Sequence, residues 1–345
     1  MSLLQETCDA IRGRSHEIEQ HIIDSWNAGS SVEQYGRLVN VVAQYGAATN
    51  QEQLTVPKPC MIIASADHGV ADMGVSAYPK ETTVGMTQNY LIPKGAGANS
   101  LANYCGAQME VIDMGIDADM IWVPGLRSHK LGMGTKNFVE EPAMTREQAI
   151  EGIEIGIRLV KEKIDEGFNV FLVGEMGISN TTASALMTAK FAGLSAEEAT
   201  GRGTNISDER LKLKQRIVHD VLEKYKNIPK DDAIGILSSV GGFEFTCIVG
   251  VILGAAANNA LVIIDGFNTS ACALVAKTLV PQAMDYVMAS HLSAEKAAKS
   301  SLENLGLEAY VDLGLCLGEA SGGSIQMGML DLAVHMYLAV TGGKA

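Results

Sequence analysis

The stretch NVFLVGEMGISNTTASALMTAKFAG, residues 169–193, decides the fold. Its first five residues, 169–173, are mostly apolar and strand-favouring, as expected of a strand buried on both faces of a parallel sheet. The glycine-containing segment 174–177 then lets the backbone turn sharply. Residues 180–182 (Asn-Thr-Thr) are helix-capping types that precede an alanine-rich run. The sequence therefore predicts a strand, a glycine turn and a helix, as in an α/β fold.

The start of the predicted helix is a candidate anion site. The first turn of a helix has N–H groups without partners and carries partial positive charge, which suits a phosphate or a carboxylate. An ordinary loop between a strand and a helix would have the same local sequence. The stretch alone therefore leaves both interpretations open.

Three further apolar runs predict strands at residues 60–66, 109–112 and 261–264. With the strand at 169–173, each predicted strand is followed within two residues by a carboxylate: Asp67, Asp113, Glu175 and Asp265. Ligands of an open parallel sheet bind beyond the carboxyl ends of its strands, so we expect these acids to surround one crevice. The alternative for each acid is that it caps the next helix.

Helical periodicity covers much of the remaining chain. Residues 1–50 read as two or three helical segments with a break at 29–31. Thr145 and Gln148 form a capping-box pattern that opens an amphipathic helix. A second amphipathic helix is expected over 208–225. The segment between 117 and 145 reads as irregular.

Composition excludes several classes of partner. A formal net charge of -14 argues against nucleic acid and against an anionic membrane surface, because both require a basic face. The most apolar span, 246–264, is interrupted by Asn258 and Asn259, so we expect a buried helix and a strand rather than a membrane crossing. No C-x-x-C pair occurs among the six cysteines, which we interpret as reduced core residues of a cytoplasmic protein.

Several chemistries lack their motifs. No G-x-G-x-x-G follows a predicted strand, and no G-K-S or G-K-T closes a glycine loop. The seven histidines include no H-x-x-x-H pair, so we expect no zinc site. His68 and His291 stand in candidate site loops, where a lone histidine is more often a hydrogen-bonded structural residue than a catalyst.

Two glutamates are candidate bases. Glu175 and Glu319 stand in apolar or glycine-rich settings, and a glutamate shielded from water has a raised pKa that makes it a better base near neutrality. The alternative is a capping or salt-bridged structural acid. Glu319 has no cationic neighbour in sequence, which favours the base.

A set of motifs carries a resemblance to a known family. They occur in one order over about residues 60–330: DHGVADMGVSAYPKETT, VGEMGISNTT, GRGTN with Lys214 downstream, VGGFEF, IIDGFNTS, SHLSAEK and LGLCLGEASGG. Together they resemble the nicotinate-nucleotide:dimethylbenzimidazole phosphoribosyltransferases of cobamide lower-ligand assembly.

The resemblance implies a Rossmann-like parallel sheet with helices on both faces. It implies a large domain over 51–300 and a small helical domain from residues 1–50 and 301–345. It also implies a dimer with active sites near the subunit interface. The implied reaction transfers phosphoribosyl from nicotinate mononucleotide to an aromatic base and gives an α-riboside phosphate and nicotinate. Nicotinate mononucleotide is then a substrate, and neither a cofactor nor a metal is implied.

The resemblance also implies site residues. Glu319 matches the family's catalytic glutamate, which takes the proton of the incoming base, and Glu175 is the second catalytic candidate. Tyr78, Met86 and Leu317 correspond to the base pocket. The nucleotide and phosphate positions are Gly177, Ser179, Asn180, Thr181, Gly203, Lys214, Asp265 and Ser293.

Three departures from the family pattern leave alternatives open. Ala320 and Asn205 stand where glycine is common in the family, which bears on the shape of the pocket. Met86 stands where some relatives have glutamine, and a methionine cannot read a ring nitrogen. A phenol- or p-cresol-transferring chain paired with a paralogous subunit is therefore an alternative, as is a catalytically quiet partner subunit.

Overall fold

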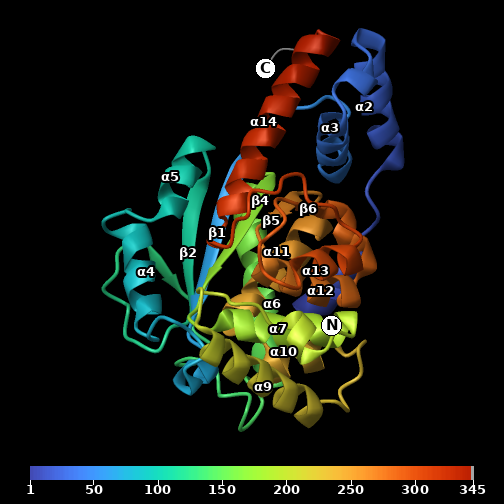
Figure 1. Ribbon diagram of the computed structural model, residues 1–345. Helices are drawn as coiled ribbons and strands as arrows, with labels where there is room; N and C mark the ends of the chain where they lie inside the picture. Colours follow the sequence, from blue (N-terminus) through green and yellow to red (C-terminus); the bar gives the residue numbers. More distant parts are fainter. Residues whose placement is uncertain (343–345) are drawn as a thin grey trace.

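The computed structural model describes residues 1–342, and a six-stranded sheet organises them (Figure 1). Every neighbouring pair of strands is parallel, in the order β3-β2-β1-β4-β5-β6. This is the order of doubly wound nucleotide-binding sheets, in which the direction of winding reverses between β1 and β4. The strands are β1 (Pro59–Ala66), β2 (Gln108–Gly115), β3 (Leu126–Ser128), β4 (Val170–Met176), β5 (Leu261–Ile264) and β6 (Val287–Ala289).

The four strands expected from apolar runs are confirmed as β1, β2, β4 and β5. The two edge strands were missed: β3 lies within the segment expected to be irregular, and β6 follows a 3-10 turn. Each has three residues. A run of that length is too short for the period-2 signal that identifies a strand.

The helices follow the strands. They are α1 (Leu3–Ala10), α2 (His16–Gly29), α3 (Arg37–Ala48), α4 (Thr82–Leu91), α5 (Gly97–Tyr104), α6 (Arg146–Asp165), α7 (Asn180–Ala192), α8 (Ala196–Ala199), α9 (Asp208–Lys224), α10 (Ala233–Val240), α11 (Phe243–Ala257), α12 (Phe267–Leu279), α13 (Ala298–Leu305) and α14 (Ser321–Thr341), with 3-10 turns η1 (Val32–Gln34), η2 (Gly69–Met73) and η3 (Pro281–Tyr286). The capping box of Thr145 and Gln148 is confirmed at the start of α6. Helices α11 and α12 contact one face of the sheet, with α6 packed against α11, and α4, α5 and the start of α14 contact the other (Figure 1).

The terminal segments pack together. Helix α14 leaves the sheet and runs up to α2 and α3 (Figure 1). Trp26 of α2 is fully buried there, with its ring 5.7 Å from that of Tyr337 on α14. Helix α1 instead packs against α6 and α11. The division of the chain into domains stays a prediction.

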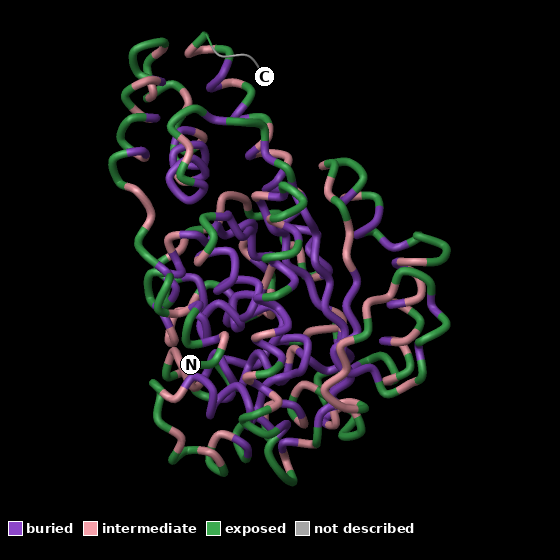
Figure 2. Tube along the Cα trace, turned by 180° about the vertical axis from the view of Figure 1, so that it is seen from behind, coloured by how far each residue is buried: buried purple, intermediate pink, exposed green. Residues whose placement is uncertain are grey.

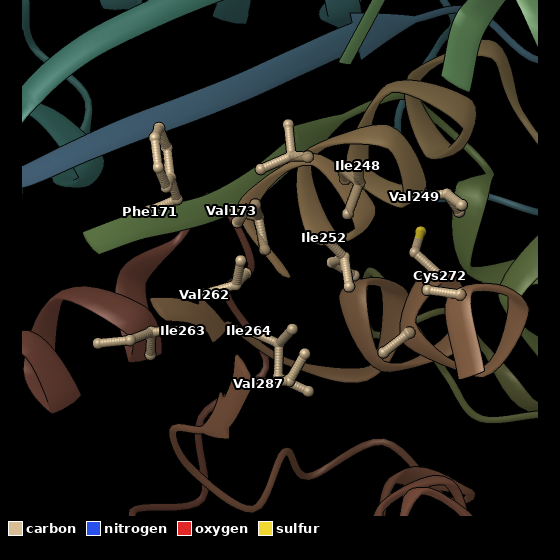
Figure 3. Close-up of a cluster of buried hydrophobic side chains, with 14 of the residues drawn as sticks. Phe171, Val173, Ile248, Val249, Ile252, Val262, Ile263, Ile264, Cys272 and Val287 are labelled. Carbon is tan, nitrogen blue, oxygen red and sulfur yellow. The ribbon is translucent and has the colours of Figure 1, made fainter. Parts of the chain in front are cut away.

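The core lies along the central strands, where the buried residues concentrate (Figure 2). Side chains of β4 and β5 meet α11 and α12 there, as Phe171, Val262, Ile252 and Cys272 show (Figure 3). Helix α11 is buried from Phe243 to Ala256, as its mostly apolar sequence predicts. Among residues 1–342, no helix combines the length and apolarity that a membrane crossing needs.

The expectation for the cysteines holds in part. All six are free thiols, and Cys60, Cys247 and Cys272 are buried in the core. Cys316 is exposed, so its interpretation as a core residue was wrong. It lies in a segment without regular secondary structure before α14, where an apolar sequence does not imply burial.

Candidate active site

An open cavity of about 750 Å³, a volume that includes solvent at its mouth, lies beyond the carboxyl ends of β4 and β5. This is the edge where ligands of doubly wound sheets bind. Nine of the residues expected in the site line it: Glu175, Gly177, Asn180, Thr181, Gly203, Asp265, Ser293, Leu317 and Glu319. Its other lining residues include His291, Glu295 and Asn268. The lining therefore combines four carboxylates with one histidine.

Glu175 is held by amide side chains. Its Oε2 accepts a short hydrogen bond from Nδ2 of Asn180, in the first turn of α7. Oδ1 of Asn180 in turn accepts a bond of 3.1 Å from Nδ2 of Asn268 on α12. The chain of bonds ties the end of β4 to the N-termini of two helices.

Glu319 sits in an unusual backbone segment. Gly318, Glu319 and Ala320 all have positive φ, at 83°, 58° and 59°. Positive φ is unfavourable for residues with a Cβ and is found mainly where function or packing requires it. Ala320 and also Asn205, at φ 58°, are the two positions where the resemblance implies glycine, and a positive φ is the conformation that favours glycine. The chain thus adopts positive φ at two non-glycine residues, Ala320 in this turn and Asn205 in the loop between α8 and α9.

Close packing fixes this segment. A Cβ on Gly174 of β4 would lie 2.7 Å from the Ala320 nitrogen and 2.9 Å from the Glu319 carbonyl carbon. The backbone at 319–320 therefore rests directly on the strand. From β5, Oδ1 of Asp265 accepts hydrogen bonds from the Gly322 and Gly323 nitrogens, at 2.6 and 3.3 Å, and so caps α14. A carboxylate is favourable at a helix N-terminus.

Burial changes the acidity of the carboxyls. Desolvation, opposed by the Asn268 amide and reinforced by the charges of Glu244 and Asp265, raises the pKa of Glu175 to about 7. Burial also raises the pKa of Glu319, while the neighbouring Tyr90 phenol lowers it. Tyr90 is fully buried on α4, and its hydroxyl makes no regular hydrogen bond. Two glutamates that are protonated more easily than usual therefore share one cavity.

The opposite side of the cavity suits an anion. Residues 177, 178, 180 and 181 bring the N-terminus of α7 to the cavity wall. Behind it, Nζ of the buried Lys214 donates a hydrogen bond of 2.8 Å to Oγ1 of Thr181. A Cβ on Gly203 would lie 3.4 Å from that Nζ. Desolvation lowers the pKa of Lys214 to about 8.

The expected crevice of four acids is partly wrong. Asp113 lies outside the cavity: its Oδ1 accepts from the Gly115 and Ile116 nitrogens, and its Oδ2 pairs with Lys130 at 2.8 Å. The helix-capping alternative does not hold for this acid either, because Gly115 ends β2 itself and the next element in the chain is strand β3. Asp67 likewise accepts a hydrogen bond from the Asp117 nitrogen and lines a neighbouring hollow instead.

Besides Lys214, three expected site residues do not line the cavity. Tyr78 is exposed by 56%, and Met86 packs against the core from α4. Their role in a base pocket stays a prediction. Ser179 caps α7 with φ 79°, and its buried hydroxyl has no hydrogen-bond partner.

Sequence reasoning missed Tyr90 and left the histidines undecided. Tyr90 stands within an ordinary helical segment and has no local motif. His291 lines the cavity, with its Nδ1 4.0 Å from Oδ1 of Asp265. His68 forms a buried pair with Glu244, as its structural interpretation predicts.

Comparison with known proteins adds independent findings. A family model described as a phosphoribosyltransferase matches residues 15–343. The nicotinate-nucleotide–dimethylbenzimidazole phosphoribosyltransferase of Geobacter sulfurreducens is 43% identical over 301 residues, which cover 87% of this chain and 85% of the relative. The protein of the same name from Chloroflexus aggregans is 42% identical over 298 residues, 86% and 84% of the two chains. The crystal structure of CobT from Thermus thermophilus superposes with a TM-score of 0.88 at 32% identity and covers 95% of this chain and 99% of its own.

Proposed function

The chain belongs to the nicotinate-nucleotide–dimethylbenzimidazole phosphoribosyltransferase family, and from this premise we propose that it transfers phosphoribosyl from nicotinate mononucleotide to an aromatic base of the benzimidazole class. The products are an α-riboside 5′-phosphate and nicotinate, for the assembly of the cobamide nucleotide loop. One observation carries the proposal: buried Glu319 faces the same cavity as the N-terminus of α7.

The reaction exchanges one N-glycosidic bond for another. The bond between C1′ and the pyridinium nitrogen breaks, and its electron pair leaves with nicotinate and neutralises that nitrogen. A ring nitrogen of the incoming base forms the new bond to C1′ from the opposite face. The proton on the other ring nitrogen passes to Glu319. The leaving group needs little acid assistance, so catalysis rests on positioning and on removal of that proton.

The remaining side chains follow from charge. The phosphate binds at the N-terminus of α7, beside Thr181 and Gly203 with Lys214 behind them, because main-chain N–H groups hold an anion there. Glu175 and Asp265 lie toward the ribose. Their carboxylates stabilise the positive charge that develops at C1′ as the donor bond breaks. An acidic cavity and a local anion site thus serve the two ends of one substrate.

The test is product formation from defined substrates. Purified protein is incubated with nicotinate mononucleotide and 5,6-dimethylbenzimidazole, other benzimidazoles, phenol or p-cresol, and the products are identified by mass. We expect a benzimidazole riboside phosphate and nicotinate. Transfer to phenols alone would replace the proposed acceptor class, and no transfer to any base would refute the activity.

We also propose that the enzyme is a cytoplasmic dimer, either of identical chains or with a paralogous chain. The six free thiols agree with a reducing compartment. Ile121 and Trp122, exposed by 88% and 59%, are adjacent apolar side chains that a partner would cover. Sedimentation at micromolar concentration should give twice the monomer mass; a monomer under turnover conditions would refute the dimer.

A further inference from the structure

Two of the sequence motifs, DHG and VGGFEF, bring together a buried ion pair that has no role in the proposed reaction. Nε2 of His68, just after β1, lies 2.6 Å from Oε1 of Glu244 in the first turn of α11. Both side chains have no exposed surface. Burial opposes the charge on the imidazole, and the carboxylates of Glu244, Asp67 and Glu175 outweigh it and raise the pKa of His68. Burial and the neighbouring carboxylates thus act in opposite directions on the imidazole, and the carboxylates prevail.

Two glycines make room for the pair. A Cβ on Gly177 would lie 2.6 Å from the Ala66 carbonyl oxygen and 3.2 Å from both Oε1 of Glu244 and Cδ2 of His68. A Cβ on Gly242 would collide with Oε2 of Glu244 and lie 2.5 Å from Cε1 of His68. The pair thus lies against Gly177 in the turn between β4 and α7, and neither of its side chains lines the cavity. That turn carries Glu175 on one side and the first N–H groups of α7 on the other.

Stability alone does not explain the pair. Replacing a buried ion pair with apolar side chains of similar size is often neutral or stabilising, because two charges no longer have to be desolvated. Nδ1 of His68 and Oε2 of Glu244 are also buried without hydrogen-bond partners, which adds to the cost. Because the pair does not clearly stabilise the fold and lies against the turn that borders the cavity, a role in shaping that turn is the better explanation.

We propose that His68 and Glu244 are positioning residues that hold the turn after β4 in place, and thereby fix Glu175 and the anion-binding start of α7 toward the cavity. This inference rests on the proposed function. The pair touches Gly177 and not the cavity, so it acts through the turn. A displacement of that turn by about 1 Å is enough to lower the rate up to a hundredfold.

The electrostatic environment of Glu175 allows a specific readout. The ionisable groups that face it from the surrounding elements are Glu244, Asp265, Glu319, His68, Tyr90 and Cys272. The charge of Glu244 contributes to the raised pKa of Glu175. Removing that charge should therefore shift the acid limb of the pH profile of kcat/KM toward lower pH, and the size of that shift measures the coupling between the pair and Glu175.

The experiment compares three variants with the wild type. His68→Leu combined with Glu244→Leu removes both charges, Glu244→Gln removes one charge at nearly constant size, and Asp113→Asn makes the same exchange at a buried acid outside the cavity. Thermal unfolding, affinity for nicotinate mononucleotide by calorimetry, and the pH profile of transfer are measured for each.

We expect the double variant to unfold at or above the wild-type temperature, yet to bind nicotinate mononucleotide about tenfold to a hundredfold more weakly. Glu244→Gln should shift the acid limb of the pH profile toward lower pH. Asp113→Asn should change neither the affinity for nicotinate mononucleotide nor the position of that limb. Wild-type affinity in the folded double variant, or an unshifted limb in Glu244→Gln, overturns the inference. If the double variant does not fold, Glu244→Gln decides the matter. Absence of transfer in the wild type would refute the proposed function instead.

Discussion

Exchange of Glu319 for glutamine is the sharpest perturbation of the proposed reaction. The two side chains have the same shape, and the turn at 318–320 is held by backbone contacts with Gly174 and by the Asp265 cap. The variant therefore removes the proton acceptor and leaves its surroundings in place. A positioned general base contributes about 10²- to 10⁴-fold to the rate, which corresponds to about 3–5 kcal/mol in the barrier. We expect kcat to fall by this factor.

Binding and stability supply internal controls for that variant. The phosphate end of the substrate lies at α7, so affinity for nicotinate mononucleotide should stay within about threefold of wild type, less than about 0.7 kcal/mol. The pKa of Glu319 is raised above 4.5 in the folded protein, so the folded state binds more protons than the unfolded chain and loses stability as the pH rises. A glutamine does not titrate. Glu319→Gln should therefore unfold at the same or a higher temperature than wild type at pH 8.

The assay is single-turnover transfer to 5,6-dimethylbenzimidazole, followed by mass, beside calorimetric titration with nicotinate mononucleotide. A folded variant with kcat within threefold of wild type would refute the role of Glu319. A variant that has lost nucleotide affinity and rate together would place Glu319 in binding rather than in proton transfer.

Three further predictions concern pH, charge and backbone. The kcat/KM of the wild type should rise with pH through an apparent pKa above 4.5, because Glu319 must be ionised and the neighbouring Glu175 titrates at about 7; a profile flat from pH 5 to 8 would contradict this. Lys214→Met should weaken nucleotide binding. It should also raise stability near pH 7 by at most about 3 kcal/mol, because burial of the charged lysine, with its pKa lowered to about 8, costs the folded wild type stability that it recovers only as the pH rises from 8 toward 10.5. Reduced stability by thermal unfolding would refute this prediction. Gly174→Ala should displace the 319–320 backbone, cost about 1–3 kcal/mol in urea unfolding and lower kcat, whereas Gly323→Ala, whose nearest contact would be 3.6 Å, should leave activity unchanged. Equal effects of the two alanine variants would contradict the close-packing argument.

The positions of the four central strands follow from sequence because their signal is strong, whereas their order in the sheet came only from the structure. Strands β1, β2, β4 and β5 are apolar runs bounded by turn residues, which is the pattern expected of strands that are buried on both faces of a sheet. The edge strands β3 and β6 have three residues each, which is too few for a pattern. Whether these two short segments form strands depends on their pairing with β2 and β5, which local sequence does not indicate.

The site divides in the same way. Glu319 was found because it stands among glycines, and the positive φ at 318–320 is the reason such residues occur there. Asp113 was misplaced because β2 continues to Gly115, so this acid lies within the strand and accepts hydrogen bonds from the Gly115 and Ile116 nitrogens. Tyr90 and Glu244 were missed as site neighbours because their relation to Glu319 and Gly177 exists only in the folded chain. Long-range contacts of this kind leave no trace in local spacing.

The most direct test is a crystal structure of the protein with nicotinate mononucleotide and 5,6-dimethylbenzimidazole, or with the riboside phosphate product. We predict a Glu319 carboxyl oxygen about 2.6–3.2 Å from a ring nitrogen of the base, and the phosphate at the N-terminus of α7. A base bound away from Glu319, or a phosphate bound outside the cavity, would contradict the account.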